Sequence, residues 1–191
     1  LNSEAHQGDL SAVLLQNLNP LVNLIRVPKK PIILMDEWES KIKAIVENTW
    51  NKDVNSLSGV PSWMLVLIKA VLKKTGREYL TDVWPNLEVF FHGGISFEPY
   101  REQYKTLIPS NKMHYMETYN ASEGFFGLQD DPTDSSLLMM PDYGIFYEFI
   151  PMNEVGNAHP TVLPLESVET GKNYAMVITT SGGLWRYQIG D

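Results

Sequence analysis

Residues 87–118 contain two short apolar runs on either side of a helical pattern, and this arrangement constrains the fold most. The first run, Leu87 to Phe91, is bounded by Pro85-Asn86 and by Gly93-Gly94. A continuous apolar run of this length is typical of a strand buried on both faces of a parallel sheet. "EPYREQYKTLI" then predicts a helix that begins near Ser96, and "KMHYMETY" predicts a second strand. Strand, glycine-rich turn, helix and strand together predict a βαβ unit.

The residues before this unit predict two helices. In "ILMDEWESKIKAIVENTW", apolar side chains recur at helical spacing, and Asp36 with Glu39 three residues later has the pattern of a capping box. The predicted buried stripe of this helix consists of Trp38, Ile42, Ile45, Val46 and Thr49.

The second helix lies in "NSLSGVPSWMLVLIKAVLKKTG", where Gly59 and Pro61 mark its start and Gly76 its end. It is apolar nearly all round from Trp63 to Leu72, so we expect it to be buried on several sides. One interpretation is an internal core helix. The other is that its start, Pro61-Ser62-Trp63, lines a pocket for an apolar substrate.

Beyond Gly124 the pattern changes to short runs rich in β-branched and aromatic residues, separated by Pro, Asn and Gly turns. The expected strands are "SLLMM", "YGIFYEFIP", "NYAMVITT" and "GLWRYQIG". They predict an antiparallel meander or small barrel joined to the α/β part. The expected fold class is therefore α/β. We expect a mixed sheet with flanking helices over residues 1–123 and an antiparallel β portion over residues 124–191.

Composition excludes several classes of protein. Of 191 residues, 43% are apolar and 20% are charged, as in an ordinary globular domain. The absence of cysteine excludes disulfides and thiolate metal sites and favours a cytoplasmic setting. The apolar runs of the sequence are too short to cross a membrane. Residues 81–191 carry 5 Lys and Arg against 15 Asp and Glu, which disfavours nucleic-acid binding because phosphates need a basic surface.

"FFHGGIS" places Gly93 and Gly94 at the carboxyl end of the first predicted strand. Ligands bind at such strand ends in open α/β sheets, and glycine lets the backbone come close to a ligand. A plain turn uses the same residues, so a binding loop and a simple turn are both open at this point.

"ETYNASEG" follows the second predicted strand, and we expect it to form a loop at the same edge of the sheet. Thr118, Tyr119 and Ser122 offer hydroxyl groups for a phosphate, and the tyrosine ring offers a flat face for adenine. Glu123 offers a carboxylate for Mg²⁺ bridging phosphate oxygens. A hydrolase nucleophile elbow is excluded at Ser122, because Asn120 stands where the elbow requires glycine.

"WRYQIGD" ends the chain after another predicted strand, and Asp191 is suited to accept hydrogen bonds from both hydroxyls of a ribose. The three loops together offer contacts for every part of ATP. The four histidines are too scattered in sequence for a metal site. The acidic run Asp130 to Asp134 lacks the alternation and the closing Glu of a calcium loop, so a solvated turn is expected there.

"HGG" (92–94), "YNASE" (119–123) and "YQIGD" (187–191) resemble successive motifs of the adenylate-forming superfamily. The closer similarity is to the auxin-responsive promoter family, the acyl acid-amido synthetases of plants and their bacterial relatives. Its motifs read roughly Tyr-x-x-Ser-Glu and Tyr-Arg-x-Gly-Asp. "GVPSWML", "DYGIFYEFIP" and "NYAMVITTSGGLWRY" also resemble this family, so the similarity covers most of the chain.

The resemblance implies a two-step reaction. A carboxylate attacks the α-phosphate of ATP to give an acyl-adenylate and pyrophosphate, and an amine then displaces AMP to give an amide. The resemblance also implies that Glu123 binds Mg²⁺, that Ser122 lies near the α-phosphate and that Tyr119 stacks on adenine. The other nucleotide contacts that it implies are Gly93 and Gly94 at the adenine and Asp191 at the ribose. Thr118, from its hydroxyl group alone, is expected as a further nucleotide contact.

The sequence departs from the family pattern in two ways. Gln188 stands where the amido synthetases commonly have Arg, although Arg186 lies two residues earlier. The chain also contains no Ser/Thr/Gly-rich phosphate loop with Lys, does not begin with Met and stops at Asp191. The resemblance therefore implies a central fragment of the large adenylating domain, inactive by itself, with the phosphate loop upstream and a small C-terminal domain downstream.

Several functions are compatible with the residues. The first is an amido synthetase fragment that acts on a small-molecule carboxylic acid and an amine or amino acid. The runner-up reaction is thioester formation with coenzyme A. A non-catalytic nucleotide- or acyl-binding module and a plain scaffold domain are the alternatives from other classes. No feature of the sequence indicates an oligomeric state.

Overall fold

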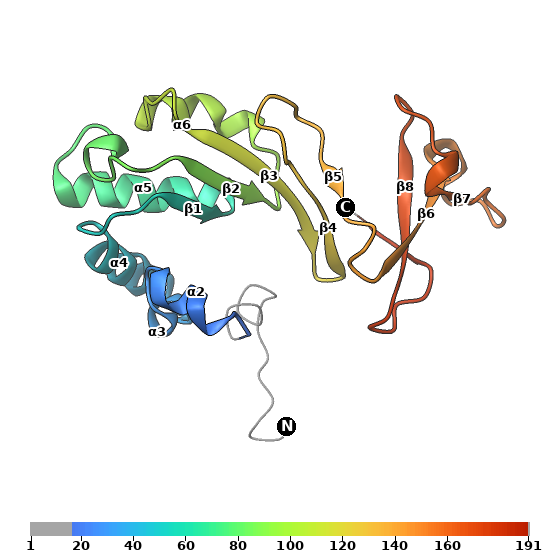
Figure 1. Ribbon diagram of the computed structural model, residues 1–191, viewed down its shortest axis with the longest axis horizontal. Helices are drawn as coiled ribbons and strands as arrows, with labels where there is room; N and C mark the ends of the chain where they lie inside the picture. Colours follow the sequence, from blue (N-terminus) through green and yellow to red (C-terminus); the bar gives the residue numbers. More distant parts are fainter. Residues whose placement is uncertain (1–16, 191) are drawn as a thin grey trace, which may run out of the picture. The chain divides into compact units, whose positions relative to one another are not determined.

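The computed structural model describes residues 17–190 (Figure 1). Its strands form one sheet in the order β1-β2-β3-β4-β5 and a second in the order β7-β6-β8-β9. By its internal contacts the chain divides into two units. Within the described residues, the first unit contains residues 17–122 together with Leu128–Leu137, and the second contains Glu123–Gly127 and residues 138–190. Each unit is described by itself.

Three parallel strands form the centre of the first unit. β1 (Ser56–Gly59) pairs with β2 (Val89–Gly93), and β2 pairs with β3 (His114–Ala121). Figure 1 shows the three arrows pointing the same way. The predicted parallel neighbours, Leu87–Phe91 and Met113–Thr118, are confirmed. β1 was not predicted, because its residues were assigned to the start of the following helix.

The helix α4 (Trp38–Thr49) begins one residue later than its capping pattern predicts. The N-cap is Glu37, whose carboxylate accepts hydrogen bonds from the backbone nitrogens of Glu39 at 2.9 Å and Ser40 at 2.6 Å. The prediction of Asp36 as the cap was therefore wrong. Of the predicted stripe, Val46 and Thr49 are buried, and Ile42 and Ile45 are half-buried.

The first residue of that stripe, Trp38, is 43% exposed, so its predicted burial was wrong.

The helix α5 (Pro61–Thr75) has the predicted bounds. Proline begins it, and Gly76 ends it with φ +65°, a left-handed conformation that glycine adopts without steric cost. Burial on several sides was the wrong expectation. Leu65, Ile68 and Leu72 face the core, whereas Trp63 and Val66 are 58% and 47% exposed. The helix has one buried face despite its apolar composition.

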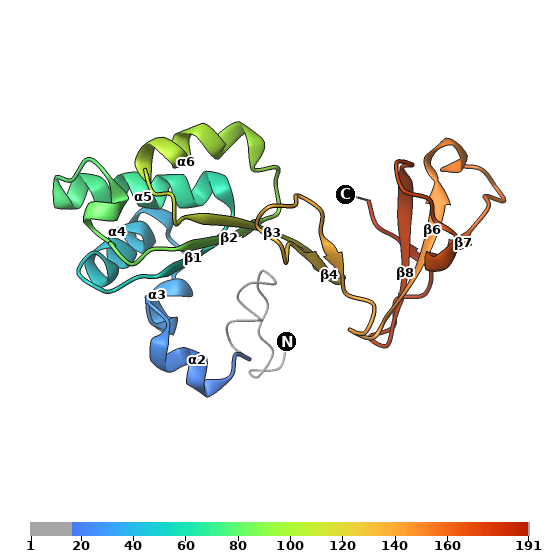
Figure 2. The same ribbon diagram turned by 45° about the horizontal axis from the view of Figure 1, so that its top comes forward.

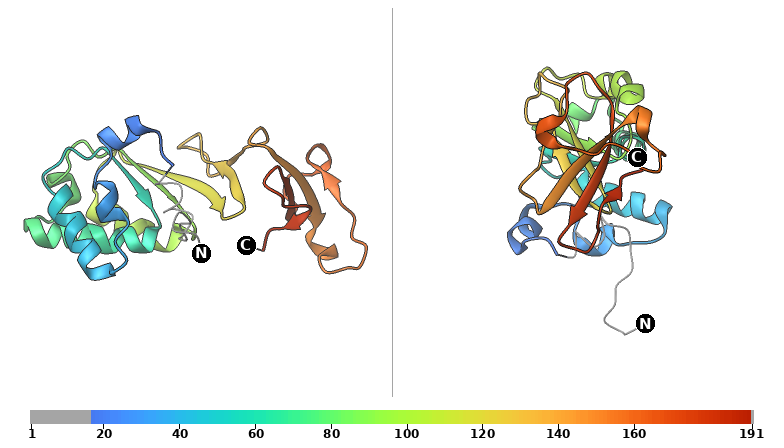
Figure 3. Two further views of the ribbon diagram at one scale, coloured as in Figure 1. Left: turned by 90° about the horizontal axis from the view of Figure 1, so that it is seen from below. Right: turned by 90° about the vertical axis from the view of Figure 1, so that its right-hand side faces the viewer.

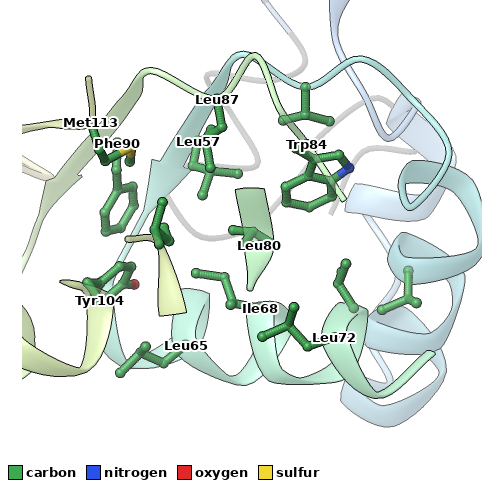
Figure 4. Packing of buried hydrophobic residues seen from close by; sticks show 14 of the residues in the cluster. Leu57, Leu65, Ile68, Leu72, Leu80, Trp84, Leu87, Phe90, Tyr104 and Met113 are labelled. Atoms are coloured by element: carbon green, nitrogen blue, oxygen red, sulfur yellow. The ribbon is translucent and has the colours of Figure 1, made fainter. Parts of the chain in front are cut away.

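The core of the first unit lies between α5 and the parallel strands. In Figure 4, side chains of α5 such as Leu65 and Ile68 point at Leu57 of β1 and Phe90 of β2. Trp84 closes one end of this layer, and its indole nitrogen donates a hydrogen bond of 3.1 Å to the carbonyl oxygen of Thr49. The packed layer fixes the strands whose ends carry the predicted site.

The remaining short elements of the first unit surround this core. They are the helices α2 (Pro20–Ile25), α3 (Lys30–Ile33) and α6 (Arg101–Leu107) and the 3₁₀ turns η1 (Leu80–Asp82) and η2 (Glu98–Tyr100). The predicted helix near Ser96 is thus η2 followed by α6. No helix within residues 17–190 is long and apolar enough to cross a membrane.

The second unit is antiparallel, as predicted. β6 (Ile145–Pro151) pairs with β8 (Tyr174–Thr180) over its whole length, and the two strands run side by side in Figures 2 and 3. The short strands β7 (Leu163–Pro164) and β9 (Tyr187–Gln188) complete this sheet, and 3₁₀ turns η3 (Met152–Glu154) and η4 (Leu165–Ser167) accompany it. The strands β4 (Gly124–Leu128) and β5 (Leu138–Met139) belong to the other sheet. The strand predicted in "GLWRYQIG" is only two residues long.

Candidate functional site

The carboxyl ends of β1, β2 and β3 lie at one edge of the parallel sheet, because the three strands run in the same direction. β3 ends at Ala121, two residues beyond the predicted strand "KMHYMETY" and inside the expected loop "ETYNASEG". Thr118 and Tyr119 therefore lie within a strand, and the expected loop is only the two-residue turn Ser122-Glu123 between β3 and β4. The "YNASE" motif is a strand end and a hairpin tip.

Gly93 lies opposite Thr118 in the register of β2 and β3. A Cβ at this position would overlap the carbonyl oxygen of Thr118 and would lie 2.8 Å from its Oγ1. The Thr118 hydroxyl also donates a hydrogen bond of 3.1 Å to the carbonyl oxygen of His92. Thr118 thus joins the two strands through its side chain, and its contact with a nucleotide stays a prediction.

The residues after Gly93 form an exposed loop. Gly94 has φ +81°, and a Cβ there would lie 3.6 Å from Val60, the residue that precedes α5. Ile95 is 39% exposed, Ser96 is exposed, and the loop ends at the buried Phe97. The backbone of this loop is open to solvent beside the start of α5, which suits close approach of a ligand.

A buried aromatic layer lies beneath the loop. His92 is 3% exposed, and its ring stacks on Phe97 with centroids 4.3 Å apart. Burial, and then the charge of Arg101, lowers the pKa of His92 to about 4, so the imidazole is neutral near pH 7. Burial also raises the pKa of Tyr115, on the neighbouring strand, to about 12. Sequence reasoning named His92 as part of the "HGG" motif and among the scattered histidines, and it assigned the side chain no role.

Glu123 is the carboxylate of the hairpin tip. Its side chain is half-buried, and within residues 17–190 it makes no hydrogen bond or ion pair, while Ser122 beside it is exposed. The described residues contain no cluster of three or more His, Asp or Glu side chains that could hold a metal ion. An unpaired carboxylate fits Mg²⁺ that takes most of its ligands from phosphate oxygens and water.

The start of α5 carries the predicted acyl-binding residues. Pro61 is buried, and its carbonyl oxygen accepts a hydrogen bond of 2.8 Å from the hydroxyl of the buried Tyr104. Ser62 is half-buried. Trp63 lies with its ring centroid 5.9 Å from that of Trp38. The two exposed tryptophans form an aromatic surface. The sequence did not predict this surface, because Trp38 was expected to be buried.

The C-terminal motif lies only partly within the structure. Asp191, predicted at the ribose, lies outside the described residues. Arg186, two residues before Gln188, has φ +46°, and its Nε donates to a carboxylate oxygen of Glu148 at 3.1 Å. In the second unit this arginine is therefore paired with an acidic side chain of β6. The predicted solvated turn at 130–134 is exposed, and Asp131 accepts from the backbone nitrogen and hydroxyl of Thr133.

Two family models match the chain. The GH3 family N-terminal domain matches residues 2–113, and the GH3 family central domain matches residues 138–191. The chain belongs to the GH3 family. This confirms the resemblance that the three motifs indicate. The hairpin with Ser122 and Glu123 lies between the two matched regions of this GH3 chain.

Named relatives agree with the family. Over 165 residues the chain is 30% identical to the indole-3-acetic acid-amido synthetase GH3.4 of Arabidopsis thaliana. This alignment covers 81% of this chain and 26% of that protein. Over 123 residues it is 37% identical to the indole-3-acetic acid-amido synthetase GH3.8 of Oryza sativa subsp. indica. This alignment covers 59% of this chain and 20% of that protein. The chain thus spans about a quarter or less of the length of these relatives.

A solved structure supports the fold. The GH3.15 acyl acid amido synthetase aligns with a TM-score of 0.71 over 94% of this chain and 40% of that chain, at 17% sequence identity. At this identity the comparison shows a shared fold, and it confirms the predicted α/β class.

Proposed function

We propose that this GH3 chain is part of an ATP-dependent ligase that activates a carboxylic acid as acyl-AMP and transfers the acyl group to an amine, forming an amide. Family membership supports this proposal, as do the named relatives, which are amido synthetases. We place the enzyme in the cytoplasm, and we regard residues 1–123 and 124–191 as the α/β part and the β-rich subdomain of one adenylating domain.

One structural observation supports the proposal most. The Gly93-Gly94 loop follows β2, and the turn that begins at Ser122 follows its parallel neighbour β3, at the same edge of the sheet. Ligands of open α/β sheets bind at this edge. A loop with open backbone and a turn with an unpaired carboxylate are the groups that ATP and its cation require there.

Each residue has a proposed role. Gly93 and Gly94 allow the adenine to approach the backbone. Ser122 donates a hydrogen bond to the α-phosphate, where negative charge grows as the acid attacks. Glu123 would hold Mg²⁺, and that ion, when bound, neutralises charge on the separating phosphates. The other proposed nucleotide contacts are Thr118, Tyr119 and Asp191.

The acyl acid is proposed to bind at the start of α5. Pro61, Ser62 and the exposed Trp63 lie at the same edge as the glycine loop, since Val60 is close to Gly94. An apolar or aromatic acid would pack against Trp63, with its carboxylate directed at the phosphates. The acceptor is an amine or amino acid.

The experiment is ATP–pyrophosphate exchange by the full-length protein with a panel of aliphatic and aromatic carboxylic acids. We expect exchange that depends on both the acid and Mg²⁺. Mass spectrometry of reactions with single amino acids or with coenzyme A then identifies an amide or a thioester. The absence of acid-dependent exchange across the panel would contradict adenylation, and a thioester product would contradict the amido synthetase assignment.

A further inference from the structure

Two aromatic side chains flank the loop between β2 and η2 in sequence and stack on each other. His92 precedes the loop and Phe97 follows it, and the two are 3% and 2% exposed. Their rings stack with centroids 4.3 Å apart and planes inclined by 21°. The four residues between them, 93–96, are half-buried or exposed. The loop therefore has open backbone and a buried base, and we call this base the aromatic clip, formed by His92 and Phe97.

Neighbouring side chains hold the clip in place. Tyr115 of β3 stacks on Phe97 with centroids 4.9 Å apart, and the guanidinium of Arg101 lies 5.0 Å from the centre of the Phe97 ring. Phe90 packs against both clip residues, with centroid distances of 5.5 Å to His92 and 6.2 Å to Phe97. Aromatic pairs at these separations are stabilising, so Phe97 is fixed from β2, β3 and α6.

Aromatic packing against Phe90 and Phe97 holds the imidazole of His92 in place. Its Nδ1 is buried and has no hydrogen-bond partner within the described residues. A buried polar atom without a partner destabilises the fold. We infer that the shape and the aromatic face of the ring matter at residue 92, and that a phenyl ring there would pack in the same way. His92 is also tied to the site through its backbone, because its carbonyl oxygen accepts the Thr118 hydroxyl.

We propose that the aromatic clip positions the Gly93-Gly94 loop for the nucleotide, so that His92 and Phe97 are positioning residues for adenylation. Neither is assigned a contact with substrate. The inference rests on the proposed function, because it takes the nucleotide to bind at this loop. Loss of the clip lets residues 93–96 sample many conformations, and binding must then select the competent one. That selection raises the apparent dissociation constant of ATP.

The test compares His92→Ala and His92→Phe in the full-length protein. We expect His92→Ala to raise the KM for ATP in pyrophosphate exchange about tenfold, which is ~1.4 kcal/mol, with kcat within about twofold. His92→Phe restores the stack, so its KM for ATP should stay within about twofold of wild type. The matched control is Leu72→Ala, which opens a cavity at the far part of α5 and should lower stability without changing the KM for ATP.

A second measurement tests, in the absence of ATP, whether the aromatic clip holds the loop. Amide hydrogen exchange of residues 94–97 should become faster in His92→Ala than in wild type and stay at the wild-type rate in His92→Phe and Leu72→Ala. Unchanged loop exchange in His92→Ala would overturn the clip. Faster loop exchange with an unchanged KM for ATP would overturn the positioning role. Wild-type protein without any ATP–pyrophosphate exchange would overturn the proposed function, and the amide exchange data would then still decide whether the clip holds the loop.

Discussion

The hydroxyl of Thr118 donates a hydrogen bond of 3.1 Å to the carbonyl oxygen of His92. This bond joins β2 to β3 one residue before the glycine loop begins. Gly93 lies directly opposite Thr118 in the register of the two strands. The glycine loop therefore starts from a tightly packed junction between β2 and β3, and β3 continues from that junction to Ala121, where the hairpin turn follows.

Gly93→Ala should disrupt this junction. The added Cβ would overlap the Thr118 carbonyl oxygen, and backbone cannot move aside as a flexible side chain can. We expect the free energy of unfolding of the full-length protein to fall by about 1–3 kcal/mol, as for other overpacked positions, measured by urea denaturation. Gly182→Ala is the control, because a Cβ there meets only the Thr180 hydroxyl at 3.5 Å. Equal stability of the two variants would contradict the close packing at Gly93.

The parallel strands could be predicted because their signal is local. Buried strands of a parallel sheet read as continuous apolar runs, and Leu87–Phe91 is such a run between Pro and Gly. The end of α5 at Gly76 was equally readable, since a left-handed cap requires glycine. In the second unit, alternating burial along β6 matched the pattern of an antiparallel strand.

The site was harder to read, because its geometry depends on residues far apart in sequence. β3 runs through Tyr119 to Ala121, and nothing in "ETYNASEG" separates a strand end from a loop. The exposure of Trp63 depends on which face of α5 meets β1 and β2. The role of His92 depends on Phe97 stacking against it, and a sequence pattern does not show that pairing.

Glu123→Gln should lower the rate of adenylation while leaving the fold intact. The amide keeps the size of the side chain but removes the charge that holds a hard cation. We expect kcat for ATP–pyrophosphate exchange by the full-length protein to fall by roughly 10²–10³, with a higher Mg²⁺ requirement and an unchanged Tm. Glu166→Gln, at an exposed position of η4, is the control for loss of one acidic charge. Exchange within about twofold of wild type, or a large loss of Tm, would rule out the metal-binding role.

Trp63→Ala should change acid recognition with little effect on stability. The side chain is 58% exposed and its described ring contact is with Trp38, so the loss should stay below about 1.5 kcal/mol. If the acid packs on this ring, its KM should rise about tenfold, ~1.4 kcal/mol, and the KM for ATP should not change. Val66→Ala, at an exposed position one turn along α5, should leave both constants unchanged. An unaltered KM for every acid in the panel would place the acyl site elsewhere.

The stability of the fold should depend on pH through His92. Its pKa is lowered to about 4 in the folded chain, whereas an unfolded histidine titrates near 6.5. Between these values the unfolded state binds more protons, so stability falls as the pH falls. The ionisable side chain whose charge acts on the imidazole is Arg101 of α6. On β3, Glu117 is the register partner of His92, and Tyr115 stacks on Phe97, which in turn stacks on His92.

His92→Phe cannot take up this proton, so the variant should become more stable relative to wild type as the pH is lowered. The two pKa values correspond to a relative gain of about 3 kcal/mol between pH 7 and pH 4. Urea denaturation of the full-length protein at a series of pH values measures this difference, and comparison with wild type cancels the titration of other groups. Leu72→Ala, which removes no ionisable group, is the control, and its difference from wild type should stay constant across the series. A constant difference between wild type and His92→Phe from pH 7 to pH 4 would mean that the buried imidazole titrates as in the unfolded chain, and burial beneath the glycine loop would then not keep it neutral.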